Sequence, residues 1–238
     1  MKRRTTLAMA SLALLASGCG QQAGTSSPTN AAADKVGSCA PGDAGVVHAL
    51  PVYATLDLDH DGVGNTLMVT RPDSTCPNVM FSKVAGHVTS VDLGSVQLTL
   101  DSARRVIVPG HPGDLVAIRE VHPRGGFQLH LYGYAGGKLA EVTTPDGAPP
   151  MPFVATDTKG GYLSASCIDH GFVLRQAVTH RPPGVVFAWD IKEASYRLDG
   201  TTAKPGGVKE IKNNVLDQEL AKTYPALVKR QMFVTGCG

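Results

Sequence analysis

Short runs of β-branched or alternating residues, separated by Gly, Pro, Asp or Asn, constrain the fold of this chain more than any other feature. Such residues favour the pleated, half-buried surface of a sheet. The runs recur at intervals of about 8–12 residues, a rhythm typical of sandwiches, barrels and propeller-type arrays of sheets. The predicted strands are 66–70, 79–84, 87–91, 95–100, 105–108, 115–121, 127–134, 138–142, 162–167, 172–178, 185–191, 194–198 and 207–211.

A single stretch near the end of the chain indicates a helix. It spans Leu216–Leu227, with Asp217 as a capping residue and Pro225 as a stop. We therefore predict an all-β fold of antiparallel sheets, either propeller-blade-like or a sandwich, with one short C-terminal helix.

Three segments share a similar strand rhythm, although not sequence identity. They are 53–100, 111–145 and 153–198, and each opens on an Asp-rich or Gly-rich turn. This rhythm is compatible with propeller-like blades of four strands. Three blades are too few to close a ring, so we do not expect a closed propeller.

The chain begins with a short exported leader. After a positively charged start, the apolar run 5–16 is too short to span a bilayer and suits a signal peptide. Leu15-Ala16-Ser17-Gly18-Cys19 then resembles the lipobox of bacterial lipoproteins, although Leu is usual at the position of Ala16. The resemblance implies removal of residues 1–18 and lipidation of Cys19, which anchors the chain at the extracytoplasmic face of the cell membrane. The alternative is a secretory leader cleaved near the same place.

Residues 19–37 comprise the cysteine to be lipidated and a flexible tether. The tether has almost no large apolar side chains with which to order itself, and its reach is about 25 Å. Residues 38–238 then form a β-rich extracytoplasmic domain, long enough for a real core. Without the leader, 19 basic face 20 acidic side chains. No basic patch stands out, so we expect no nucleic-acid partner.

Four cysteines remain if Cys19 is lipidated, and an even number in an exported chain indicates two disulfides. Three pairings are open. We favour Cys39–Cys76 and Cys167–Cys237, because each would pin one end of the domain to a nearby part of the fold. A metal site made of these cysteines is a weaker alternative, since the sequence contains no CxxC.

One local motif carries chemistry: the acidic stretch 57–65, Asp-Leu-Asp-His-Asp-Gly-Val-Gly-Asn. Ca²⁺ takes six to eight oxygen ligands, and a tight loop supplies them at alternate positions. The predicted ligands are the side chains of Asp57, Asp59 and Asp61, the carbonyl of Val63, and Asn65 directly or through water. The alternative is a polar turn whose acids are solvated.

The acidic stretch is not an EF-hand, because Met68 stands where the twelfth loop position needs Glu. It resembles instead the Asp-x-Asp-x-Asp-Gly-x-x-Asp loop of FG-GAP and VCBS repeats, which implies a structural Ca²⁺ between strands. The chain departs from that pattern at Asn65, where Asp is usual, and at His60, where Gly is common. Both departures should weaken affinity.

No catalytic motif accompanies the acidic stretch: the sequence contains neither HExxH nor Gly-x-Ser-x-Gly. We therefore expect no enzyme. The resemblance to FG-GAP/VCBS-like lipoproteins of actinobacterial type implies a binding or scaffold role towards a cell-wall polymer or an envelope protein. Two alternatives stay open: an accessory lipoprotein that regulates an envelope-stress signalling system, and a hydrolase with an unrecognised site.

Overall fold

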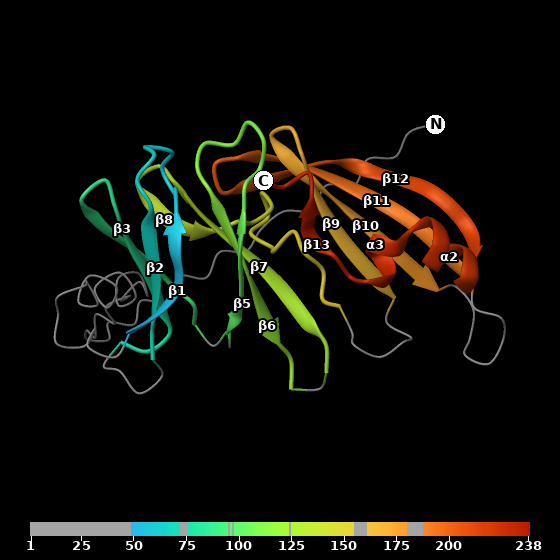
Figure 1. Ribbon diagram of the computed structural model, residues 1–238, viewed down its shortest axis with the longest axis horizontal. Coiled ribbons are helices and arrows are strands. Elements are labelled where there is room, and N and C mark those ends of the chain that lie inside the picture. The colour runs from blue at the N-terminus through green and yellow to red at the C-terminus, as the bar shows by residue number, and fades with distance from the viewer. Residues whose placement is uncertain are drawn as a thin grey trace, which may run out of the picture.

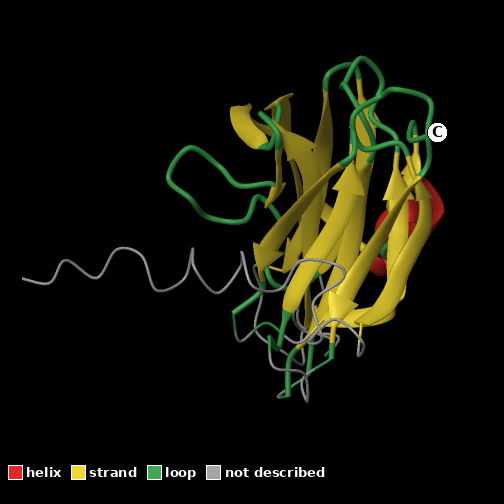
Figure 2. Ribbon diagram, turned by 90° about the vertical axis from the view of Figure 1, so that its left-hand side faces the viewer, coloured by secondary structure: helices red, strands yellow, loops and turns green. Residues whose placement is uncertain are grey.

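The computed structural model describes residues 49–71, 76–94, 96, 98–123, 125–154, 161–179 and 188–238. Within these residues it contains thirteen strands and two short helices, labelled in Figure 1. The strands form three sheets, in which all neighbours but one pair are antiparallel. The predicted all-β class is thereby confirmed, and Figure 2 shows how small the helical part is.

Sheets 1 and 2 are simple meanders, in which each strand pairs with the next along the chain. Their hairpins are local and several turns are tight; Gly136 and Gly137, for example, both take positive φ (59° and 81°) in a two-residue turn. Sheet 1 contains β1 (Ala49–Leu56), β2 (Asn65–Thr70), β3 (Val79–Val84) and β4 (His87–Asp92). Sheet 2 contains β5 (Leu98–Val106), β6 (Leu115–Val121), β7 (Phe127–Ala135) and β8 (Lys138–Glu141).

Sheet 3 is the largest and has one non-local strand. Its order is β12-β11-β10-β9-β13, and β13 lies parallel to β9, with Met232 opposite Ala165. Its strands are β9 (Tyr162–Ile168), β10 (Gly171–Thr179), β11 (Ala188–Asp199), β12 (Thr202–Leu216) and β13 (Met232–Thr235).

The three sheets pack face to face in chain order, which Figure 1 shows as blue-green, green and orange-red layers. Sheet 2 is the middle layer, so both of its faces are apolar. Val116 and Ile118 join a core shared with sheet 1, whereas Leu115 and Ala117 join a core shared with sheet 3. Successive side chains of a strand point to opposite faces, which explains this division. A third core lies between sheet 3 and the helices.

The predicted single helix is two helices. α2 (Asp217–Thr223) ends before Pro225, but Pro225 then begins α3 (Pro225–Val228), where its missing N–H costs nothing. Asp217 is the first residue of α2 rather than its cap, and its carboxylate accepts a hydrogen bond from the Trp189 indole.

Most predicted strands match observed strands of the three sheets, but the ends of many of them are shifted. Each of the three predicted segments falls largely within one sheet. β1 and β13 were not predicted. The runs 95–100 and 105–108 both overlap one longer strand, β5, and the runs 185–191 and 194–198 both overlap another, β11; residues 95, 97 and 185–187 of these runs lie outside the described residues. β12 is also much longer than the predicted 207–211.

Candidate metal centre

The acidic loop of residues 57–64 joins β1 to β2. Leu56 pairs with Asn65 at its base, so the loop is the tip of a hairpin. The backbone turns back on itself through left-handed conformations at His60 (φ 61°) and Gly62 (φ 81°). Glycine adopts this conformation most easily, and the sharp turn predicted at Gly62 is present.

The turn gathers the three predicted carboxylate ligands. One oxygen from each of Asp57, Asp59 and Asp61 lies within 4.8 Å of the others. Asp57 and Asp59 are half-buried, whereas Asp61 is exposed. Asp61 also accepts a hydrogen bond from the Val63 N–H at 2.7 Å, and Asp57 accepts one from the Gly62 N–H at 3.2 Å. These bonds hold the carboxylates on the inner side of the turn.

Two oxygens of this cluster are buried and unsatisfied. Oδ1 of Asp57 and Oδ1 of Asp59 have almost no solvent exposure and no hydrogen-bond partner. A buried carboxylate oxygen without a donor is costly, and neighbouring carboxylates repel each other. A hard cation would remove both costs at once, because it provides the missing positive partner.

The two other predicted ligands have different surroundings. Val63 has an exposed side chain, and its backbone N–H is directed at Asp61. Asn65 is buried, and its Oδ1 accepts a hydrogen bond from the Leu58 N–H at 3.0 Å while its Nδ2 donates to the Lys83 carbonyl at 3.1 Å. The amide of Asn65 therefore holds the loop against sheet 1, and a water is the simpler link from it to a cation.

Asp114, which precedes β6 in sheet 2, fastens the loop to that sheet. Its carboxylate accepts hydrogen bonds from the Asp57 N–H at 2.6 Å and from Nε of Arg105 at 2.7 Å. Its own N–H donates to the Asp57 carbonyl at 2.7 Å. Asp114 is 4 % exposed, so this is a buried tie between the first and second sheets. Sequence reasoning missed it, because nothing local pairs two residues so far apart.

Backbones also approach closely at this junction. Gly113 has φ of 90°, and a Cβ there would lie against the Leu58 carbonyl, well inside van der Waals contact. Leu58 itself is fully buried in the core shared by sheets 1 and 2. The acidic loop is therefore anchored through an apolar side chain, a buried carboxylate and a glycine contact, all beside the three carboxylates.

A second polar cluster, centred on His130, lies on the face of sheet 2 that carries Tyr132 towards sheet 1. His130 is 5 % exposed, and its Nδ1 and Nε2 lie 2.7 Å from Glu141 Oε1 and 3.0 Å from Glu120 Oε2. Burial lowers the pKa of His130, but its hydrogen bonds to Glu141 and Glu120 and their charges together outweigh this and raise it. Burial, with the same two charges, also raises the pKa of Tyr132.

The two carboxylates of this cluster favour the protonated form of His130. A protonated imidazole donates from both nitrogens, and here each nitrogen faces a carboxylate, so neither remains for a substrate. The cluster joins β6, β7 and β8 through their side chains. Sequence reasoning did not identify it, since the three residues meet only when these strands pair.

The predicted disulfide between Cys167 and Cys237 is confirmed, with Cα atoms 5.1 Å apart. Cys76 is also disulfide-bonded. Cys39, its predicted partner, lies outside the described residues, as do the leader, Cys19 and the tether, so those assignments stay predictions.

In the part of the chain that the structure describes, no helix has the length and apolar character needed to cross a membrane.

Comparison of the chain with protein-family profiles, with curated proteins and with solved structures finds no match. The resemblance to FG-GAP and VCBS repeats therefore rests on the acidic loop alone.

Proposed function

We propose that this chain is a membrane-anchored extracytoplasmic lipoprotein that acts as a non-catalytic binding or scaffold module, with a structural Ca²⁺ in the acidic loop. The observation that carries the calcium assignment is the pair of buried, unpartnered oxygens on Asp57 and Asp59 beside Asp61. Three carboxylates contribute part of the six to eight oxygens that Ca²⁺ takes. Loop carbonyls and water complete the set.

The cation has a mechanical role in this proposal. Asp57 also bonds to Asp114 through its backbone, so a cation on its side chain stiffens the junction between sheets 1 and 2. A stiff junction keeps the two sheets in a fixed relation, which is what a binding surface spread over both of them requires. The lipid at Cys19 and the tether up to residue 37 keep the module close to the membrane and within reach of a wall polymer or envelope protein.

Thermal melting in millimolar calcium and then in EGTA tests the metal site. Calcium should raise the melting temperature, by a stabilisation of about 2.7 kcal/mol at a hundredfold excess over Kd. Asp59→Asn with Asp61→Asn should abolish the shift. The matched control is Asp199→Asn with Glu210→Gln, which removes the same charge from exposed positions outside the loop and should keep it. A wild-type melting temperature that is equal in calcium and EGTA rejects the site.

Membrane fractionation after labelling with a fatty acid tests the anchor. Wild type should carry the label and sediment with membranes, whereas Cys19→Ser should lose both properties. A Cys19→Ser chain that is still labelled and membrane-bound rejects lipidation at this residue.

Binding is tested separately by co-sedimentation with purified wall material. The calcium-loaded protein should pellet with this material, and the Asp59→Asn, Asp61→Asn variant should pellet less.

A further inference from the structure

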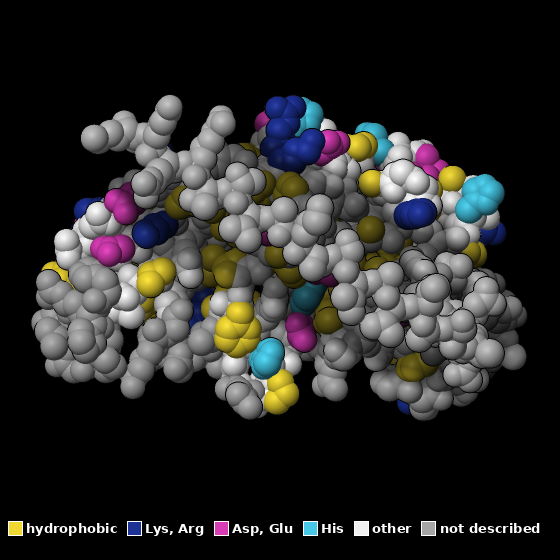
Figure 3. All heavy atoms as spheres, turned by 180° about the vertical axis from the view of Figure 1, so that it is seen from behind, with side chains coloured by type: hydrophobic (Ala, Val, Ile, Leu, Met, Phe, Trp, Pro, Cys, Tyr) yellow, Lys and Arg dark blue, Asp and Glu magenta, His cyan; other side chains and the backbone are white. Residues whose placement is uncertain are grey.

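A basic pocket opens between sheets 2 and 3, on the opposite side of the middle sheet from the acidic loop. Its volume is about 440 Å³, a size that suits a small ligand. The cations that line it are Arg104 and Arg119 from sheet 2 and Lys229 and Arg230 from the turn before β13, with Asp101 as the single carboxylate. On the face shown in Figure 3, by contrast, described basic and acidic side chains are interspersed.

An irregularity in β5 places two of these arginines. Thr99 pairs with Arg119, and Arg104 pairs with Ala117. The two paired positions are therefore five residues apart on β5 but only two apart on β6, so β5 carries extra residues between them. Bulges of this kind re-aim side chains. The Ser102 hydroxyl fixes the irregularity, since it donates to the Thr99 carbonyl and accepts from the Arg119 N–H at 2.9 Å.

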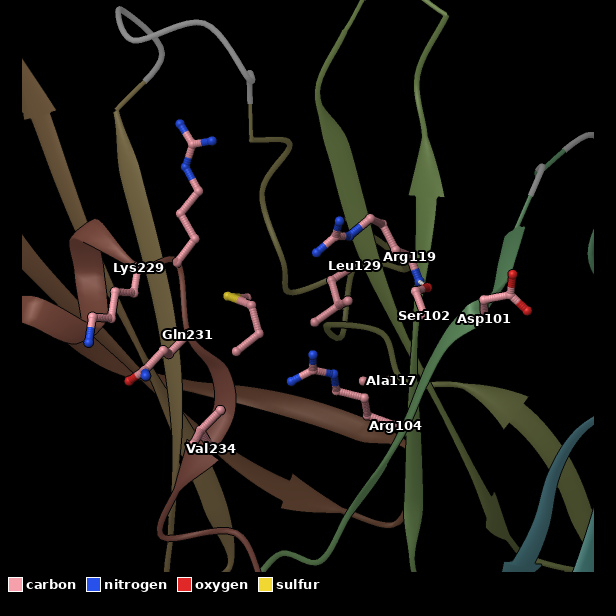
Figure 4. A pocket seen from close by; sticks show the side chains of 11 residues that line it. Asp101, Ser102, Arg104, Ala117, Arg119, Leu129, Lys229, Gln231 and Val234 are labelled. Carbon is pink, nitrogen blue, oxygen red and sulfur yellow. Dashed lines mark hydrogen bonds between the residues drawn. The ribbon is translucent and has the colours of Figure 1, made fainter.

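The two arginines point into the pocket. In Figure 4 the guanidinium groups of Arg104 and Arg119 extend from sheet 2 into the space before β13, whereas the side chains of Asp101 and Lys229 point away from it. Arg119 is held in place by the Phe127 ring, whose centroid lies 4.3 Å from its guanidinium carbon. Arg230 lines the same pocket and lies over the Tyr162 ring at 5.7 Å.

These guanidinium groups have no anionic partner among the described residues. The described ion pairs occupy other arginines and lysines, and Nε of Arg230 is buried without a hydrogen-bond partner. Like charges that face the same partly enclosed space repel more strongly than they would in bulk water. An anion that enters the pocket relieves this repulsion.

We propose that this pocket binds a small organic phosphate, which deepens the binding role proposed above. A phosphate carries up to two charges and three free oxygens, so it satisfies guanidinium forks from more than one direction, whereas a planar carboxylate satisfies one fork. Apolar side chains of Ala117, Leu129 and Met232 line the rest of the pocket and pack against the organic part.

Isothermal titration calorimetry on the purified full chain tests this proposal with three probes that share one ring. Glucose 6-phosphate should bind saturably, glucuronate at least about tenfold more weakly, and neutral glucose not at all. Arg104→Gln with Arg119→Gln should weaken glucose 6-phosphate binding by about tenfold or more. Arg104→Lys with Arg119→Lys keeps the charge without the planar fork and should fall between this variant and wild type.

The matched control is Arg197→Gln with Lys209→Gln, which removes two exposed charges outside the pocket and should leave the affinity unchanged. Absence of saturable binding to wild type, an equal loss in the control, or glucuronate binding as tight as that of the phosphate each overturns the proposal. The melting transition of each variant checks that it folds, and the calcium shift of that transition keeps the two sites distinguishable. If phosphate does not bind but the calcium shift persists, the basic pocket is rejected and the acidic loop stands as proposed. If phosphate binds but calcium causes no shift, the acidic loop is rejected and the basic pocket stands.

Discussion

The two junctions of the middle sheet are built differently. Among the described residues, the core shared by sheets 2 and 3 contains 19 buried apolar residues, and the Cys167–Cys237 disulfide joins β9 to the residues after β13 on the sheet 3 side of it. The core shared by sheets 1 and 2 contains 11, and charged groups complete it: Asp114 and Arg105 at the acidic loop. One junction therefore depends mainly on apolar area, and the other also on charge.

This difference teaches which part of the molecule should respond to its surroundings. Apolar burial is insensitive to calcium and to pH, whereas buried charges respond to both. We expect sheet 1 to loosen when calcium is removed, while sheets 2 and 3 remain joined. Native-state hydrogen exchange, followed separately for the amides of sheet 1 and sheet 3, measures this directly.

The largest expected effect concerns sheet 3, which contributes one side of the apolar junction. Replacing Cys167 and Cys237 by Ala removes a cross-link between residues 70 apart, and the free energy of unfolding should fall by about 4 kcal/mol in the chain-entropy account. Urea unfolding measures the loss, and hydrogen exchange should locate it in β9 and β13. Equal loss of protection in β1–β4 would show that the junctions are not independent.

The next effect concerns the charged junction. Asp114→Ala removes the acceptor of the part-buried Asp57 N–H and the ion-pair partner of the exposed Arg105, and should cost about 2–3 kcal/mol. Asp92→Ala is the control, because Asp92 is exposed and accepts one local hydrogen bond from Gly94. The calcium-dependent shift should also shrink in Asp114→Ala and persist in Asp92→Ala; equal urea midpoints for the two variants contradict the tie.

A smaller effect separates backbone contact from backbone strain at the same junction. Ala at Gly113 must adopt φ of 90° and also clashes with the Leu58 carbonyl, whereas Ala at Gly86 must adopt φ of 81° in open space. We expect Gly113→Ala to lower the free energy of unfolding by about 2 kcal/mol more than Gly86→Ala. Chemical denaturation of both variants measures the difference, and a difference near zero indicates that the loop is not docked as described.

The smallest effect is the pH response of the His130 cluster. The pKa of His130 is raised in the folded chain, so its stabilisation is complete below about pH 6.5 and is lost as pH rises through the folded-state value. His130→Gln should therefore be less stable than wild type by about 1 kcal/mol at about pH 5.5, with the gap narrowing at higher pH. Exposed His87→Gln is the control. If the difference in stability between wild type and His130→Gln widens as pH rises, the raised pKa of His130 is rejected.

Local patterns predicted much of sheets 1 and 2. The runs 79–84 and 115–121 coincide with β3 and β6, because strands buried on one or both faces between turn residues leave a clear pattern. The gathering of Asp57, Asp59 and Asp61 was also predictable, since one tight turn is enough to bring alternate residues together.

Features that depend on distant partners escaped prediction. β13 has only four residues and becomes a strand by pairing with β9, nearly seventy positions earlier in the chain. Asp114 and the His130 cluster depend on pairings that no single segment encodes, and the basic pocket requires an irregular β5 to meet the turn before β13. In each case the contact is made by the tertiary fold and leaves no local pattern.

The parallel position of β13 imposes an order of assembly on a chain that is made from its N-terminus. Sheets 1 and 2 need only neighbouring strands, so each can close as soon as its own residues are available. Sheet 3 must wait for Met232–Thr235, and until then β9 exposes an unpaired edge that is open to other chains. Slow synthesis or early termination therefore endangers yield through aggregation at this edge, even where the finished protein is stable.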